Sequence, residues 1–286
     1  MPNNQIRYAS VIALDDKGGV LVETDGRNRV AFDFRCGIEG GANDGTIKIY
    51  HLSDSEETAI KRGAAKILLL AGSDAENGEV FAGEPVDAFS VQSESSRYLH
   101  LSLIDGDAFF SSYISMSIGA GESLGGLVEK CATRCSAPLE IGFVSPSAYR
   151  VKLPRGAVLF GSPVDIIKSA AKSLNAAFYV LKGRLYMIGA GDVPNGAEIR
   201  VDQESGLIGV PVVDHWYASF RHDINSALSL GRPVSLDPET GGGHYRIVSI
   251  RGEGDTKEGE WGLSVLAIGQ SGAGPNITAV TGNIWR

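Results

Sequence analysis

The sequence predicts a mainly β protein of the α+β class, in which two tube-like antiparallel β-barrel domains are linked by a small α+β domain. Three observations predict this architecture. The first and last thirds of the chain consist of short segments in which apolar and polar residues alternate, as in half-buried strands. Gly, Asn and Asp punctuate these segments where turns are needed. The middle of the chain differs, because it carries two helix-start signals.

The first third begins as a meander. The stretch VIALDDKGGVLVETDGRNRVAFDF is predicted to form three strands, separated by turns at residues 15–19 and 25–28. The run IKIY after Thr46 alternates in the same way and predicts a fourth strand.

A single short helix is predicted to follow the fourth strand. Ser53 is its N-cap, because Glu56 stands three residues later as in a capping box, and Gly63 ends it. Further strands follow, with turns at Asn77-Gly78 and Asp105-Gly106. Their sequences are AAKILLLAG, EVFAGEPVDAFSV and YLHLSLIDGD. Together these segments predict one barrel that carries one helix.

The middle of the chain predicts helices and a tight hairpin. Ser123 or a neighbour can cap a helix that extends to about Cys135. Ser162, followed by a proline at the first helical position, starts a second helix over VDIIKSAAKSLN. The segments AFYVL and RLYMI, separated around Lys182-Gly183, predict a hairpin.

The last third returns to strands and predicts a second barrel. The strand segments are GLIGVPVV, the region from Phe220 to Leu228, RPVSLD, HYRIVSIRGEG and WGLSVLAIG. The remaining residues are punctuated by Gly and Pro and end in Ile284 and Trp285, which predicts an extended arm whose apolar tip contacts a neighbour. The predicted domains are therefore 1–115 (first barrel), 116–204 (α+β linking domain), 205–270 (second barrel) and 271–286 (C-terminal arm).

Composition excludes several classes of protein. The chain has 286 residues, 26 Lys and Arg against 34 Asp and Glu, and a formal net charge of -8. No basic run stands out, so tight binding to nucleic acid is not expected. The N-terminus MPNNQIRYAS lacks a leader pattern, and no apolar run approaches the roughly 20 residues that span a bilayer. We expect synthesis in the cytoplasm and no stable association with a membrane.

The sharpest catalytic motif is Gly121-Glu122-Ser123-Leu124-Gly125, a match to the G-x-S-x-G nucleophile elbow between a predicted strand and a predicted helix. In the elbow, however, the serine follows its strand almost directly, whereas four residues intervene here. A helix N-cap explains Ser123 without chemistry. Three histidines downstream are conceivable bases, but nothing near them in the sequence marks one. We therefore expect no enzyme, and keep a serine hydrolase that uses Ser123 as the least favoured alternative.

No metal or cofactor is expected. Cys131 and Cys135 lie four residues apart on one face of a predicted helix, but zinc needs three or four ligands, and Cys36 does not supply the usual spacing. Three cysteines in a long chain are more typical of reduced, buried thiols than of disulfides. Asp105 and Asp107 flank a glycine, as residues of a turn do.

Two long stretches, taken together, resemble the baseplate hub or tail-tip hub proteins of tailed bacteriophages and related contractile machines. The first contains IKIYHLS, Glu57, Ile60, Gly63, ILLLAG, VFAG and Asp105-Gly106. The second contains Gly206-Leu207-Ile208-Gly209, Asn225, Leu228, Gly231, Val234, Tyr245-Arg246-Ile247, Gly254-Asp255-Thr256 and Trp261. The order and spacing of these motifs carry the resemblance, which covers most of the chain.

The resemblance implies a homotrimeric ring that joins a hexameric tail tube to a three-fold central spike in the virion tail or baseplate. Its expected partners are further copies of itself, the tail tube or distal tail protein, the central spike protein and the tape measure protein, with DNA only in transit through the lumen. An acidic lumen would repel DNA phosphates. A carbohydrate-binding or adhesion module of the tail is the alternative among non-enzymatic functions.

Overall fold

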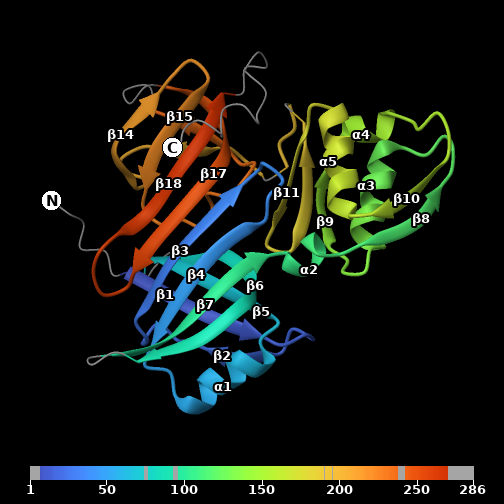
Figure 1. Cartoon of the computed structure of the whole chain (residues 1–286). Helices are drawn as coiled ribbons and strands as arrows, with labels where there is room; N and C mark the ends of the chain where they lie inside the picture. Colours follow the sequence, from blue (N-terminus) through green and yellow to red (C-terminus); the bar gives the residue numbers. More distant parts are fainter. Residues whose placement is uncertain are drawn as a thin grey trace.

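The computed structural model describes residues 7–73, 77–92, 96–189, 191–194, 196–237 and 242–269. Strands make up 52% of the structure and helices 16%, which confirms the predicted mainly β class. Figure 1 shows a large twisted β region with a smaller unit of helices and strands projecting from one side. Within the described residues, no helix is long and apolar enough to cross a membrane.

The structure falls into three consecutive groups of elements. The N-terminal group contains β1 (Arg7–Leu14), β2 (Val20–Glu23), β3 (Val30–Gly37), β4 (Asn43–Tyr50), α1 (Asp54–Gly63), β5 (Lys66–Ser73), β6 (Asn77–Gln92) and β7 (Arg97–Asp105). The middle group covers residues 107–189 and is called the α+β unit. It contains α2 (Asp107–Phe110), β8 (Ile114–Ile118), α3 (Leu124–Thr133), β9 (Glu140–Val144), α4 (Pro146–Arg150), β10 (Ala157–Gly161), α5 (Pro163–Ser173), β11 (Ala177–Leu181) and β12 (Arg184–Ile188). The C-terminal group contains β13 (Ile199–Val201), β14 (Leu207–Val213), β15 (Tyr217–His222), β16 (Pro233–Leu236), β17 (Gly243–Asp255) and β18 (Trp261–Gly269).

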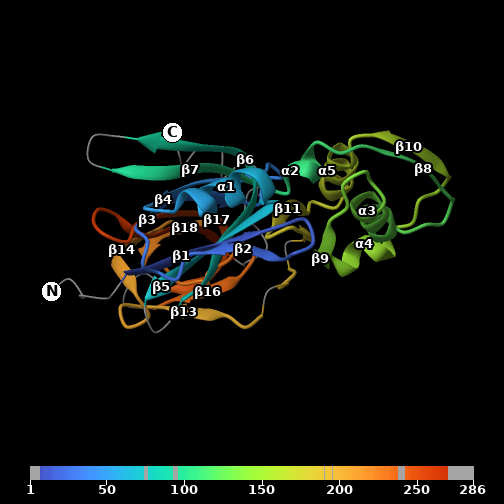
Figure 2. The same cartoon turned by 90° about the horizontal axis from the view of Figure 1, so that it is seen from below.

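The N-terminal and C-terminal groups share one 13-stranded sheet. Its main path has the order β14-β15-β18-β17-β3-β4-β7-β6-β5-β1-β2, and β13 joins through β16, which pairs with β17. The sheet folds over on itself, because β6 pairs with β7 along one half of its length and with β5 along the other. In the view from below, β1, β2 and β5 consequently form a layer that crosses the strands next to β7 (Figure 2). The α+β unit has two small sheets of its own, β8–β10 and β11–β12–β9.

The ladder between β3 and β17 joins the two β regions, and the sequence did not predict it. Phe34 lies opposite Gly252 and Phe32 lies opposite Gly254. An ion pair between Arg251 and Asp33 (2.7 Å) crosses the same ladder. We call this ladder the β3–β17 seam.

Glycines in β17 make room for aromatic rings at the seam. A Cβ atom added at Gly252 would lie 2.3 Å from ring carbons of Phe34, and one at Gly254 would lie 2.4 Å from the ring of Phe32. These rings cover the bare backbone of the glycines, which is how aromatic residues compensate for glycine in a strand. Phe34 in turn packs on Phe81, with ring centroids 5.3 Å apart.

The buried side chains form two clusters. The larger one runs through both β regions, from Val11 in β1 to Val265 in β18. The smaller one fills the α+β unit, where Val128, Ile167 and Leu185 are fully buried. The α+β unit therefore has a core of its own, while Ala177, Tyr179 and Ile188 of its β11–β12 hairpin belong to the larger core that the two β regions share. The domain limits at residues 115, 204 and 270 stay a prediction.

Two polar side chains of the β region attach the α+β unit through backbone groups. The Asp105 carboxylate accepts hydrogen bonds from the N–H groups of Lys182 (2.5 Å) and Gly183 (2.8 Å). Asn43 donates to the carbonyl of Val180 (2.7 Å). Burial raises the pKa of Asp105 to about 6, although these hydrogen bonds act to lower it. This contact between the end of β7 and the β11–β12 turn is called the junction below.

The helix starts follow the sequence patterns. Ser53 and Glu56 form the reciprocal capping box that starts α1, which ends at Gly63. Ser162 caps α5 by accepting from the backbone of Asp165 (3.3 Å). The predicted hairpin around Lys182-Gly183 is the β11–β12 pair.

Two of three local predictions were wrong. Asn77 and Gly78 are not a turn, because the β5–β6 ladder continues through them. The predicted turn at Asp105-Gly106 is present, and it leads into the short helix α2. The predicted strand from Phe220 to Leu228 ends at His222, because its ladder with β18 stops there.

Candidate assembly surfaces

Strand β14 is a free edge of the sheet, and its outward side chains are apolar. It stands last in the strand order, and no other described strand pairs with its outer side. Val210 is 83% exposed and Val212 is 62% exposed, while Ile208 and Val213 are also exposed. Trp216, in the turn to β15, adds an exposed ring. A free edge presents unpaired backbone N–H and C=O groups, so an apolar free edge is a template for a strand of another chain.

A bulge shapes this edge. The ladder between β14 and β15 is interrupted between Ile208 and Val212. Gly209 has a φ of +76°, which favours glycine, and Pro211 cannot donate a hydrogen bond to a ladder. The residue between them, Val210, is consequently lifted into solvent.

The residues that flank β14 are acidic. Asp202 and Glu204 precede the strand and Asp214 follows it, and no Lys or Arg occurs from 201 to 220. Asp202 pairs with Arg200 (2.8 Å), whereas Glu204 and Asp214 are exposed. The β14 edge therefore combines apolar surface with negative charge.

The second half of β6 is another open edge. From Glu84 onward, β6 pairs only with β7 among the described strands. Val86 and Phe89 are exposed, and Val86 is the extra residue of a bulge between Pro85 and Asp87. Proline and bulges are typical of edge strands.

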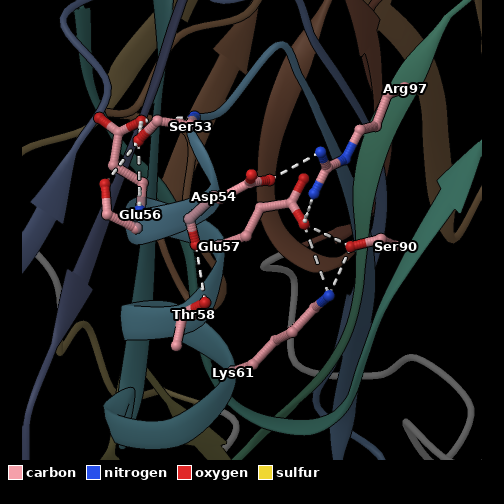
Figure 3. A network of polar contacts seen from close by, with 9 residues as sticks. Ser53, Asp54, Glu56, Glu57, Thr58, Lys61, Ser90 and Arg97 are labelled. Carbon is pink, nitrogen blue, oxygen red and sulfur yellow. Dashed lines mark hydrogen bonds and ion pairs between the residues drawn. The ribbon is translucent and has the colours of Figure 1, made fainter.

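An ionic network fastens α1 to the β6–β7 hairpin (Figure 3). The Glu57 carboxylate is nearly buried, with 4% of the residue exposed, and accepts hydrogen bonds from Arg97 Nη2 (2.9 Å) and from the Ser90 hydroxyl. The Lys61 ammonium lies 3.5 Å from the same carboxylate, and Arg97 also pairs with Asp54 (2.7 Å). Because Ser90 belongs to β6 and Arg97 to β7, the network joins three elements beside an open edge.

Replacing Glu57 with glutamine is expected to lower the free energy of unfolding by about 1–3 kcal/mol, because a neutral amide would replace a nearly buried carboxylate that accepts charge-assisted hydrogen bonds. Burial acts to raise the pKa of Glu57, but the hydrogen bonds from Ser90 and Arg97 prevail and the pKa lies below its ordinary value. The stabilisation is therefore present above the unfolded pKa and is lost as the pH falls through the folded pKa. Urea titrations at several pH values measure both effects.

Glu204→Gln is the matched control for this measurement. Glu204 is exposed and has no hydrogen bond or ion pair in the described chain, so its removal should leave stability unchanged within about 0.5 kcal/mol. Equal losses in the two variants would show that the Glu57 network contributes nothing.

Ser123 is a helix cap in the structure. Its hydroxyl accepts a hydrogen bond from the backbone N–H of Gly126 (3.1 Å) at the start of α3. The three histidines that follow it in the sequence lie in the C-terminal β region and contact residues of that region. They are His215, His222 and His244. The structure does not bring them together with Ser123.

The cysteines are free and buried. Burial raises the pKa of Cys131 to about 11 and also raises the pKa of Cys36, which keeps these thiols protonated. No group of three or more potential metal ligands occurs within the described part of the chain. Ile284 and Trp285, predicted to contact a neighbour, lie outside the described residues.

The fold matches those of solved tail proteins. A tail protein from Neisseria meningitidis MC58 is 13% identical, with a TM-score of 0.59, and the match covers 92% of this chain and 96% of that one. The 43 kDa tail protein of prophage MuSo2 from Shewanella oneidensis is 11% identical, with a TM-score of 0.58 and coverages of 92% and 98%.

A third match is an E. coli component of the type VI secretion system, described as structurally similar to the T4 bacteriophage tail proteins gp27 and gp5. It is 10% identical, with a TM-score of 0.60, and the match covers 88% of this chain and 78% of that one. A scan of protein-family models and a search of curated proteins found no match. At these identities the likeness is one of fold, and it extends over both β regions and the α+β unit.

Proposed function

We propose that this chain, which has the fold of phage and prophage tail proteins, is a structural hub protein of a phage or phage-derived tail. In this proposal three copies form a ring that adapts the hexameric tail tube to the three-fold central spike and lines the channel for DNA passage. The observation that carries it is the likeness in fold to tail proteins over about nine-tenths of the chain. The role is structural and needs no catalysis.

The strand order supports a ring. From β14 to β6 the strands lie side by side in one sheet, and this series ends in two open apolar edges. A contact between β14 of one copy and β6 of the next uses two different surfaces, so it is heterologous. Such contacts form a closed ring only if the rotation between neighbouring copies brings the last copy back to the first. Two β regions in each of three copies give six units, which matches a hexameric tube on one side and a three-fold spike on the other.

The partners and location follow from this role. We propose further copies of this chain, the tail tube or distal tail protein, the central spike protein and the tape measure protein as neighbours in the virion tail or baseplate, after synthesis in the host cytoplasm. The net charge of -8 supports a lumen that does not retain DNA. Exposed aromatic side chains are spread over several elements, and no more than two of them pack on each other among the described residues, which does not favour a single sugar-binding platform. They are Phe89 on β6, Tyr113 and Phe160 at the β8–β10 pair, Tyr149 on α4 and Trp216 beside β14.

The native mass of the protein tests the proposal. Sedimentation velocity should give a trimer for the wild type, and Val212→Asp should shift it toward monomer, because a charge on the β14 edge opposes pairing with another strand. Val193→Asp is the control, since Val193 is exposed in a loop far from either edge strand in sequence. A wild-type protein that stays monomeric at high concentration would contradict the ring.

A further inference from the structure

The α+β unit ends in a two-stranded ribbon with an exposed apolar face. β8 and β10 pair only with each other among the described strands. Val158 is 76% exposed and Phe160 is 77% exposed, two residues apart on one face of β10. The exposed ring of Tyr113 packs edge-on against Phe160, with centroids 6.4 Å apart. Large exposed side chains that contact each other are typical of a surface that binds a partner.

A basic segment adjoins this ribbon. Arg150, Lys152 and Arg155 are exposed, and none of them forms an ion pair in the described chain. Backbone hydrogen bonds hold the segment against the start of α3, for example from Gly121 N–H to the Leu153 carbonyl (2.8 Å), and β10 follows directly. The ribbon and residues 150–155 thus form one apolar and positive surface, which we call the ribbon surface.

The charge of the chain is divided between its parts. Residues 107–189 hold nine Lys and Arg against five Asp and Glu, a net charge of +4. The rest of the chain keeps 17 against 29, a net charge of -12. A surface in the positive part is therefore complementary in charge to the remainder of another copy.

The ribbon surface and the β14 edge lie on opposite sides of the molecule. Both views place β14 on one side of the sheet and the β8–β10 ribbon at the far end of the other side (Figures 1 and 2). In a head-to-tail ring, one side of each copy faces the opposite side of the next. The α+β unit of one copy therefore lies on the side that faces the β14 edge of the next copy.

The strand register places the β14–β15 turn and the α+β unit at the same end of the sheet. Gly37, where β3 ends, pairs with Ser249 of β17, and close beyond it Glu39 bridges to Phe178 of the α+β unit. The residues of β17 that precede Ser249 extend beyond this end of β3. Its residue Tyr245 pairs with Gly269, which binds the Trp216 carbonyl in the β14–β15 turn. The turn and the α+β unit therefore lie at a common end.

The geometry points to the ribbon surface as a docking site for a second copy of this chain, which inserts its β14–β15 turn there. Val212 and Val213 at the end of β14 and Trp216 in the turn supply apolar surface. Asp214 supplies a carboxylate for the unpaired cations. The inference rests on the proposed ring and assigns to it a second contact, beside the one between sheet edges. In this arrangement the α+β unit holds the β14–β15 turn of the neighbouring copy, a contact that we call the clamp.

The trimer dissociation constant tests this inference. Val158→Ser/Phe160→Ser and, separately, Arg150→Glu/Lys152→Glu should raise it at least tenfold, and added NaCl should weaken the wild-type trimer because charges attract across the contact. Val20→Ser/Val193→Ser is the control for lost apolar surface. Lys168→Glu/Lys172→Glu is the control for charge, since these exposed lysines on α5 give the same change in net charge.

Crosslinking separates failure of this inference from failure of the ring. Benzoylphenylalanine at position 160 should crosslink between copies to the peptide 202–221. A wild-type protein that does not trimerise overturns the ring and this contact together. A trimer that both ribbon variants leave intact, or crosslinks that map to other peptides, overturns only the clamp.

Discussion

Gly252→Ala is expected to destabilise the protein by about 3 kcal/mol or more, because overpacking at a rigid site is costly. The new Cβ atom would lie 2.3 Å from ring carbons of Phe34. That ring has little room to move, since Phe34 is buried between Phe32 and Phe81. Chemical denaturation followed by tryptophan fluorescence measures the loss, and poor soluble expression is the expected outcome at 37 °C.

Gly37→Ala provides the matched control at the same seam. Gly37 is the last residue of β3, and a Cβ atom there meets no other atom within 4 Å. Its cost should stay below about 1 kcal/mol. The double variant Gly252→Ala/Phe34→Leu should lose less stability than the sum of the two single variants, because the smaller side chain relieves the clash. Strict additivity would contradict the proposed contact.

Asp105→Ala should be the second large effect, with a loss of about 2–4 kcal/mol. The variant leaves the backbone donors of Lys182 and Gly183 without their acceptor at the junction, and each unsatisfied buried donor costs about 1–3 kcal/mol. Asp16→Ala, at an exposed turn, is the control and should cost less than about 0.5 kcal/mol. Hydrogen exchange should show the loss first in the β11–β12 turn. Equal protection of that turn in the variant and the wild type would contradict this role.

Asp105 also predicts a pH dependence of opposite sign to that of Glu57. Its pKa is raised from 3.8 to about 6, so between these values the folded state binds more protons than the unfolded state. The free energy of unfolding contributed by this group therefore decreases as the pH rises from about 4 to about 6. Asp105→Asn carries no titratable group at this position and should flatten that part of the profile, which stability measurements from pH 4 to pH 7 can test.

Local signals predicted most of the elements. The capping box at Ser53, the Ser-Pro start at position 162 and the Lys182-Gly183 hairpin each act over a few residues, so their structure follows from nearby sequence. Strand alternation likewise located most strands of the two β regions. The elements missed altogether were short, such as β13 with three residues and α4 with five. Such elements depend on their neighbours more than on propensity.

Long-range features escaped prediction because no local pattern encodes them. Nothing near Gly252 in the sequence identifies Phe34 as its partner, so the pairing of β3 with β17 could not be predicted. Asp105 resembled an ordinary turn residue, and its role appears only when the β11–β12 turn lies against it. For the β14 edge a signal did exist. Val210, Val212 and Val213 follow a glycine with no charge among them, a pattern of an edge strand that pairs with another chain.

The β3–β17 seam also fixes when the protein can finish folding. During synthesis, β3 emerges early, but its partner β17 lies about 200 residues later in the chain and emerges late. Until then one side of β3 has no partner strand. The nascent N-terminal region therefore has an unpaired strand edge, which can pair with other chains. Ribosomes that stall before residue 243 would release products prone to aggregation. Because β17 and then β18 complete the sheet, the fold can form only once the chain has been synthesised through residue 269.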